Sequence, residues 1–214
     1  MSNTKLHPEL KKYLQTLNGM KVLRHPLVFD VPYFGGMDER LNNQLKYKQE
    51  ALEEAIESKA IHSYIFLHER PYRLIAFCKA LNLGWGFEKD PNQYWDVLAD
   101  VWVDTESPHI NYDVWKALFE SKVPNKENFM DEEDKAYFDA LPNEFTIYRG
   151  YATSDRKGKK GLSWTTSKET AEFFANRFSP YGEPKGKIAR KKVKKEDVFG
   201  FTNRRNEYEI IYIK

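Results

Sequence analysis

The chain has 214 residues, of which 41% are hydrophobic and 31% charged, a balance that fits a globular protein with one good core. The formal net charge of +2 argues against a nucleic-acid binder that acts through overall charge. The one cysteine, Cys78, excludes an intramolecular disulfide, and its apolar neighbours favour a buried core thiol over a catalytic one. The chain contains neither a long apolar run nor a signal-like start, so we expect a cytoplasmic protein without a membrane span.

Prolines and glycines make the first 35 residues look irregular. Residues 40–120 are expected to be helical. The first helix carries an apolar stripe at intervals of four and seven residues, made of Leu41, Leu45, Leu52 and Ile56. Pro71 is placed to begin the next helix, Asp90 caps another, and a shorter helix follows Asn111.

Three tryptophans of this stretch, Trp95, Trp102 and Trp115, fall at helical spacing. That spacing favours core packing over a ligand platform. The segment from Trp95 to Trp115 also resembles helical segments of phage-encoded proteins. We therefore treat residues 1–125 as a helical N-terminal region.

After Pro124 the pattern becomes strand-rich. A helix is predicted over residues 131–141, and strands are predicted over 145–148, 162–165, 188–193, 198–201 and 208–213. A further helix follows the second of these strands, with Thr166 and Glu169 as its capping box. The predicted fold class is α+β, and residues 126–214 form its strand-rich core.

Three segments of this core carry residues of chemical interest: Arg149 and Gly150 at a strand end, Ser163 and Thr165 on the next strand, and Glu207 and Glu209 entering the last one. On a strand, side chains two residues apart point to the same face, so the two glutamates would project together. Two carboxylates on one face repel, and neither is buried cheaply without a partner. Taken singly, each residue also has a structural explanation, such as a surface ion pair for Arg149 or strand filling for Ser163.

Taken in this order, the three segments resemble the ADP-ribosyltransferase family, specifically its arginine–serine–glutamate branch in a phage-type form. The resemblance covers the chain from the helix before Arg149 to the C-terminus. It implies an ADP-ribosyltransferase-like split β-sheet core and an NAD-dependent mono-ADP-ribosyltransferase. NAD would be the co-substrate, and the partner would be a target protein, with host machinery as one candidate, modified at arginine in the host cytoplasm.

The resemblance also implies roles for the acidic pair. Glu209 would hydrogen-bond the ribose 2′-hydroxyl and stabilise the oxocarbenium-like transition state. Glu207 would orient and deprotonate the acceptor guanidinium, whose pKa is otherwise above about 12.

The remaining site residues would bind the co-substrate. Arg149 would hold the NAD diphosphate in two-point geometry, and the main chain of Gly150 would hold the nicotinamide amide. Ser163 would brace the catalytic glutamate and the ribose, and Thr165 would shape the same strand. Many relatives have Ser-Thr-Ser where this chain has Ser-Trp-Thr, but Trp164 should point away from Ser163.

Two alternatives stay open. Lysines and arginines crowd residues 156–160 and 185–195; they read either as an exposed edge strand protected against pairing or as a surface for an acidic partner such as nucleic acid. The chain could thus be a catalytically silent ADP-ribosyltransferase-fold module that binds nucleic acid or a nucleic-acid-bound protein, or an NAD hydrolase.

Phe201 is either a ring that lies against substrate or a hydrophobic anchor. The five scattered histidines predict no metal site.

Overall fold

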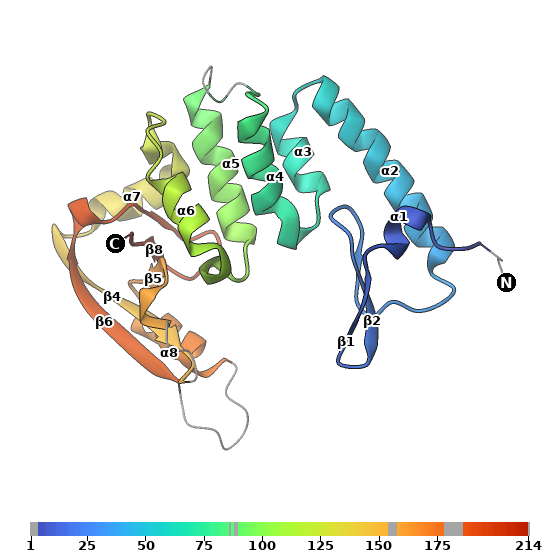
Figure 1. The fold of residues 1–214 in the computed structure, drawn as a ribbon. Helices are drawn as coiled ribbons and strands as arrows, with labels where there is room; N and C mark the ends of the chain where they lie inside the picture. The colour runs from blue at the N-terminus through green and yellow to red at the C-terminus, as the bar shows by residue number, and fades with distance from the viewer. Residues whose placement is uncertain (1–3, 86, 88–89, 154–157, 178–185, 214) are drawn as a thin grey trace. The chain divides into compact units, whose positions relative to one another are not determined.

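The computed structural model describes residues 4–85, 87, 90–153, 158–177 and 186–213. The chain forms two compact units, Met1–Phe87 and Glu88–Lys214, which we call unit 1 and unit 2 and describe separately. Both units combine helices with an antiparallel sheet, so the α+β class predicted from the sequence is confirmed (Figure 1). Among the described residues, no helix has the length and apolar character that a membrane crossing requires.

Unit 1 begins with a small sheet where the sequence looked irregular. Helix α1 (Pro8–Lys11) is followed by β1 (Leu14–Leu17), β2 (Met20–Arg24) and β3 (Phe29–Asp30), which form an antiparallel sheet in the order β1-β2-β3. Asn18 and Gly19 connect the first two strands, and both have positive φ angles, 48° and 79°. An Asn-Gly pair with this backbone is the favoured two-residue hairpin turn. The sequence therefore held a signal for this hairpin that the proline-rich context obscured.

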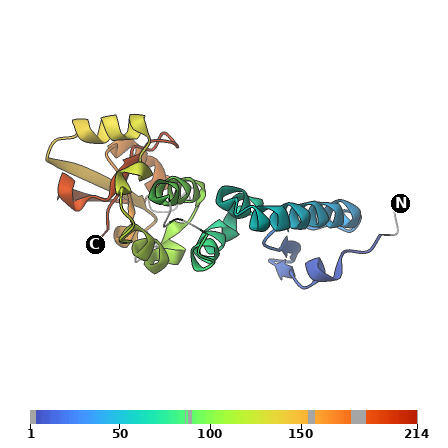
Figure 2. The same cartoon turned by 90° about the horizontal axis from the view of Figure 1, so that it is seen from above.

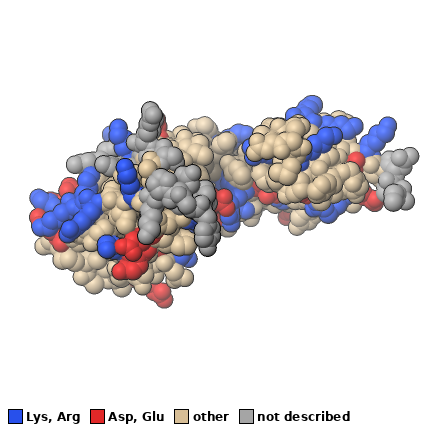
Figure 3. Space-filling view, turned by 90° about the horizontal axis from the view of Figure 1, so that it is seen from below, with Lys and Arg blue, Asp and Glu red and all other residues tan. Residues whose placement is uncertain are grey.

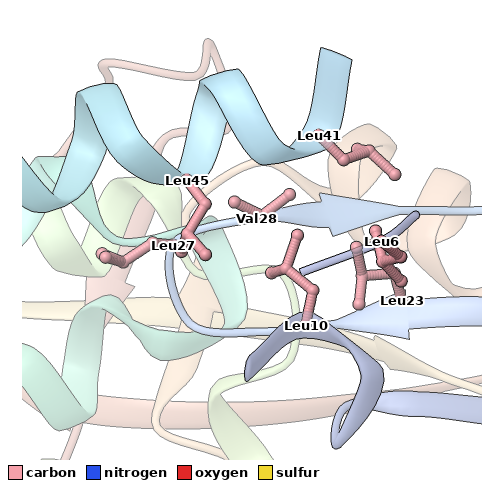
Figure 4. Packing of buried hydrophobic residues seen from close by; sticks show 7 residues of the cluster. All are labelled: Leu6, Leu10, Leu23, Leu27, Val28, Leu41 and Leu45. Atoms are coloured by element: carbon pink, nitrogen blue, oxygen red, sulfur yellow. The ribbon is translucent and has the colours of Figure 1, made fainter. Parts of the chain in front are cut away.

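After the small sheet, unit 1 continues with α2 (Asp38–Glu57), α3 (Ile61–Leu67), η1 (Arg70–Tyr72) and α4 (Arg73–Asn82). Helix α2 runs as one long helix in both ribbon views (Figures 1 and 2). Its N-terminal half packs on the small sheet, and Figure 4 shows the side chains of the resulting core: Leu6, Leu10, Leu23, Leu27, Val28, Leu41 and Leu45. The predicted stripe is thus buried at its first two positions, whereas Ile56 at its end is exposed. Cys78 on α4 is free and half-buried, and burial raises the pKa of its thiol.

Unit 2 contains all five predicted strands. They are β4 (Glu144–Tyr151), β5 (Ser163–Thr165), β6 (Lys187–Lys194), β7 (Gly200–Thr202) and β8 (Glu209–Ile211). The strands pair antiparallel in the order β6-β4-β5-β8-β7. The basic strand β6 therefore lies at one edge of the sheet, as one of the two interpretations of the sequence expected.

In the described part of unit 2, the sheet is accompanied by the α-helices α5 (Pro91–Asp104), α6 (Tyr112–Phe119), α7 (Glu132–Ala140) and α8 (Lys168–Asn176). Short 3-10 helices also occur: η2 (Pro108–Asn111), η3 (Lys126–Phe129), η4 (Gly158–Lys160) and η5 (Lys195–Asp197). Asp90 caps α5 as predicted, with its side chain accepting from two main-chain N–H groups. The cap of α8 is Ser167 rather than the predicted Thr166. The capping box was therefore placed one residue too early.

Aromatic packing explains why α5 and α6 belong to unit 2. The predicted division at residues 125/126 differs from the observed one between Phe87 and Glu88. The three tryptophans of α5 and α6 are fully buried, which confirms their predicted place in the core. Trp95 and Phe119 both contact the ring of Phe199, which precedes β7, with centroid distances of 5.6 and 4.6 Å. These contacts join residues about 80–100 positions apart, which no local sequence pattern indicates.

Candidate functional site

The central strands bring three of the predicted site residues onto one face of the sheet. Thr165 on β5 lies opposite Glu209 on β8, and Ser163 lies opposite Ile211. Because residues two apart on a strand share a face and paired residues lie side by side, Ser163, Thr165 and Glu209 point the same way. The serine strand and the strand of the second glutamate are therefore neighbours in the sheet.

Glu209 is the most deeply buried charged residue of this group. Its side chain is 2% exposed, and its Oε2 accepts a hydrogen bond of 2.9 Å from Nη2 of Arg205. The other carboxylate oxygen, Oε1, is buried and has no hydrogen-bond partner. A buried acceptor without a donor costs roughly 1–3 kcal/mol, so this oxygen is suited to a donor from outside the chain.

Glu207 also contacts the Arg205 guanidinium, but it is not part of the strand that the sequence analysis expected to align it with Glu209. Strand β8 begins only at Glu209, and Asn206 and Tyr208 both have positive φ, 57° and 48°. A tight turn, rather than strand alternation, thus aligns the two carboxylates. Oε2 of Glu207 lies 3.2 Å from Nη2 of Arg205, so a single guanidinium nitrogen contacts both acids.

Arg205 is the residue of this site that the sequence analysis missed. Besides the two carboxylates, its Nη1 donates to the main-chain carbonyls of Val103 and Thr105, at 3.1 and 3.3 Å. These carbonyls lie at the C-terminal end of α5, where the helix dipole adds negative potential. The only local signal was an arginine four residues before Glu209, and its carbonyl partners lie about a hundred residues earlier.

Burial and charge act in opposite directions on Glu207. Burial raises the pKa of its carboxyl, Arg205 lowers it, and the neighbouring Glu209 raises it again; the net direction is upward from 4.5. A carboxyl with a raised pKa accepts a proton more readily near neutral pH.

Thr165 links the start of α8 to the turn of residues 206–208, which carries Glu207 and leads into Glu209 and which we call the acidic turn. Its hydroxyl donates to the main-chain carbonyl of Glu207 at 2.7 Å and accepts from the N–H of Ser167 at 3.0 Å. Thr165 thus holds the turn that carries Glu207, and the predicted role of Ser163 toward Glu209 and the ribose stays a prediction.

Arg149 lies beside the serine strand, with its guanidinium directed at the main chain. Its Nε donates to the carbonyl of Gly158 at 2.6 Å, and Nη1 donates to the carbonyl of Ser163. The packing is close, since a Cβ added to Gly161 would lie 2.1 Å from Cζ of Arg149. Arg149 thereby ties the segment before β5 to β4, and its predicted contact with a diphosphate stays a prediction.

Gly150 has a structural requirement of its own. A Cβ at this position would lie 1.9 Å from the carbonyl oxygen of Ala171 and 2.5 Å from the nitrogen of Ala175. Because both atoms belong to the main chain of α8, only glycine lets the helix pack this closely on β4. The predicted contact of the Gly150 main chain with the nicotinamide amide stays a prediction.

A pocket of about 420 Å³ lies between α7 and the acidic turn. Its lining consists of Asp131, Glu133, Asp134, Tyr137, Phe201, Asn203, Arg204, Asn206 and Tyr208. Phe201 is buried and stacks on Tyr137, with centroids 4.3 Å apart, so it is a hydrophobic anchor rather than a free ring. The lining does not include Glu209 or Arg149.

The described residues contain no group of three or more His, Cys, Asp and Glu side chains that could hold a metal ion. Comparisons with protein-family models, with curated proteins and with solved structures found no match to this chain.

Proposed function

We propose that this chain is an NAD-dependent mono-ADP-ribosyltransferase that modifies a protein at arginine. The observation that carries the proposal is the contact of one guanidinium nitrogen with both Glu207 and Glu209, at 3.2 and 2.9 Å. An acid pair that holds the Arg205 guanidinium has the charge and spacing to hold that of an acceptor arginine. Arg205 occupies the position in this structure, so an acceptor would replace at least one of its ion pairs.

The unpartnered oxygen of Glu209 supports the second half of the reaction. Oε1 is buried without a donor, and a ribose 2′-hydroxyl would supply one. A fixed carboxylate next to the ribose would also stabilise the positive charge that develops as nicotinamide leaves. In the proposed reaction the acceptor nitrogen bonds to the anomeric carbon, nicotinamide departs with the electrons of the broken C–N bond, and the acceptor proton passes to Glu207.

The sheet supports the proposal at a coarser level. Strands β4 and β5 are paired only at Tyr148 and Thr165 among the described residues, and Arg149 lies next to β5 just beyond that pair. We propose that this divergence corresponds to the split of an ADP-ribosyltransferase-like core. Arg149 would bind the NAD diphosphate there once its guanidinium exchanges main-chain carbonyls for phosphate oxygens.

The test is an incubation with NAD labelled in its adenylate half and agmatine, a small guanidinium compound, as acceptor. We expect labelled agmatine and free nicotinamide, both abolished by Glu209→Gln. Glu132→Gln is the matched control, because Glu132 is 91% exposed and lies outside the site. Glu207→Asp should reduce transfer more strongly than nicotinamide release. Release of nicotinamide without labelled agmatine or protein would identify an NAD hydrolase, and absence of any NAD turnover would refute the enzyme proposal.

A second candidate function rests on the edge strand β6. Lysine and arginine side chains form a group at the left of Figure 3, on unit 2. The exposed basic side chains on β6 are Lys187, Arg190, Lys192 and Lys194. Part of this charge has internal uses, since Lys192 pairs with Glu144 and the ammonium of Lys191 lies 4.5 Å from the ring of Tyr212. Salt-sensitive nucleic-acid binding that is lost in Lys187→Ala/Arg190→Ala, without NAD turnover, would favour this candidate.

A further inference from the structure

The pocket between α7 and the acidic turn, which we call the Asp134 pocket, has the composition of a cation site. Three carboxylates contribute to its lining, those of Asp131, Glu133 and Asp134, against the single cation of Arg204. That cation is already paired, because Arg204 lies 2.6 Å from Asp100 and 3.6 Å from Asp131. The surface of the pocket is therefore negative, which disfavours phosphates and nucleic acid.

Acidic residues at this place have an ordinary explanation in part. Asp131 caps α7 and accepts from the N–H of Asp134, and Glu133 lies in the first turn of the helix, where negative charge stabilises the helix dipole. Capping does not account for the side chain of Asp134, which is buried and whose Oδ1 accepts from the N–H of Asn203 at 2.8 Å.

The second carboxylate oxygen of Asp134 is the observation that suggests a ligand in the pocket. Oδ2 is buried and has no hydrogen-bond partner, although Asp134 contributes to the pocket lining. Burial raises the pKa of this carboxyl and the charge of Asp131 raises it further, whereas the N–H of Asn203, the side chain of Thr202 and the charge of Arg204 oppose that rise in part. A donor that brings positive charge would satisfy the acceptor and offset the cost of burying the carboxylate.

The aromatic side of the pocket is held in place at the expense of backbone strain. Tyr208 has a φ of 48°, and for a bulky residue this backbone conformation costs on the order of 1–3 kcal/mol. Two hydrogen bonds fix it: its N–H donates to Oδ1 of Asn203 at 3.0 Å, and its carbonyl accepts from the N–H of Thr166 at 3.1 Å. The ring remains exposed and lies 5.8 Å from that of Tyr137, so one wall of the pocket offers aromatic surface to a cation.

We propose that the Asp134 pocket binds a basic side chain of the target protein, an arginine or a lysine other than the arginine that is modified. Aromatic faces together with carboxylates select guanidinium or ammonium groups. Phe201 pairs with Ile210 and Thr202 pairs with Glu209, so the pocket lies on the sheet face opposite to the Glu209 carboxylate. A target bound in the pocket would reach the acid pair around the turn at Tyr208, which stands between Glu207 and Glu209 in the chain. The proposal rests on the proposed function for its biological meaning, and it adds that the substrates are proteins with a second basic residue besides the modified arginine.

The test measures binding without NAD, so that it is independent of catalysis. A short peptide with two arginines separated by one glycine is titrated calorimetrically against the protein, and the same peptide with citrulline at both positions serves as the neutral control. We expect the arginine peptide to bind more tightly than the citrulline peptide, with an affinity that falls as salt rises. Equal or absent binding of the two peptides would overturn the proposal.

Variants localise the binding to the pocket. Tyr208→Gly removes the ring and relieves the positive φ, and Glu133→Gln removes one charge. Each should weaken binding of the arginine peptide by about three- to fivefold. Glu132→Gln removes the same charge one residue away, outside the lining, and should change affinity by less than about twofold. Unchanged affinity in both pocket variants would overturn the assignment. If the peptide binds as expected but agmatine is never modified, the transferase proposal fails while the cation site stands.

Discussion

Removing the guanidinium of Arg205 should leave the carboxylate of Glu209 buried in unit 2 without a charged partner. Arg205→Met keeps much of the aliphatic volume but deletes the ion pairs to Glu207 and Glu209 and the hydrogen bonds to Val103 and Thr105. Breaking a buried ion pair from one side costs about 3–5 kcal/mol, because the remaining charge is left without a partner. The Arg205 side chain is 29% exposed, and water can partly replace it. We therefore expect unit 2 to lose about 3 kcal/mol of unfolding free energy.

Arg204→Met is the matched control. Its side chain is exposed to nearly the same degree, 27%, but its partners Asp100 and Asp131 are themselves 37% and 47% exposed, in contrast to Glu209 at 2%. Ion pairs between exposed groups contribute about 0–1 kcal/mol. The two neighbouring arginines should therefore differ in their stability effect by about 2 kcal/mol or more.

Urea unfolding at neutral pH, followed by the fluorescence of the buried tryptophans of α5 and α6, reports on unit 2. A loss of 3 kcal/mol corresponds to a decrease of roughly 1.5 M in the urea midpoint. The double variant Arg205→Met/Glu209→Gln should regain about 2 kcal/mol over Arg205→Met alone, because it removes the stranded charge. If Arg205→Met costs less than about 1 kcal/mol, or if the second substitution regains nothing, Glu209 does not depend on Arg205 for its burial.

Three further predictions concern packing and titration. Gly150→Ala should destabilise unit 2 by about 2 kcal/mol or more in the same urea assay, because its Cβ would meet the main chain of α8 at 1.9 Å. Gly200→Ala is the control, because the nearest contact of its Cβ would be an ordinary 3.7 Å, and its unfolding free energy should stay within about 1 kcal/mol of wild type. Equal losses of unfolding free energy in the two variants would contradict the close approach of α8 to Gly150. The pKa of Glu207 is raised above 4.5, so ionisation of this carboxyl opposes folding. The unfolding free energy of wild type should therefore fall relative to that of Glu207→Gln as the pH rises from about 4 to 7. A difference between the two proteins that does not change with pH would argue against the effect of burial on Glu207. Burial lowers the pKa of His25 below 6.5, against the opposing effect of Glu9, and burial lowers the pKa of His68 in the same unit. Unit 1 should therefore lose stability as the pH falls from about 7 to 5. His25→Gln should reduce the pH dependence of the thermal midpoint of unit 1 without abolishing it, and an unchanged pH dependence would contradict the burial of His25.

Local features of unit 2 could be read from the sequence because their causes lie within a few residues. The five strands follow from β-branched and alternating patterns between turn residues. Asp90 before Pro91 caps α5 because the aspartate side chain reaches main-chain N–H groups two and three residues later. The same kind of signal, Asn18-Gly19, was present for the hairpin of unit 1, but the prolines and glycines of the first 35 residues pointed to irregular structure there.

Partners that are distant in the chain were decided by the tertiary structure. The sequence indicated that Glu207 and Glu209 needed a cation, and it contained Arg205 close by. It did not show that Arg205 would also reach the carbonyls of Val103 and Thr105, about a hundred residues earlier. Nor did it show that α5 would pack its tryptophan against Phe199 and so belong with the sheet. Helix and strand propensities depend on near neighbours, whereas burial of a charge depends on which surfaces meet when the chain collapses, and only the folded chain brings those surfaces together.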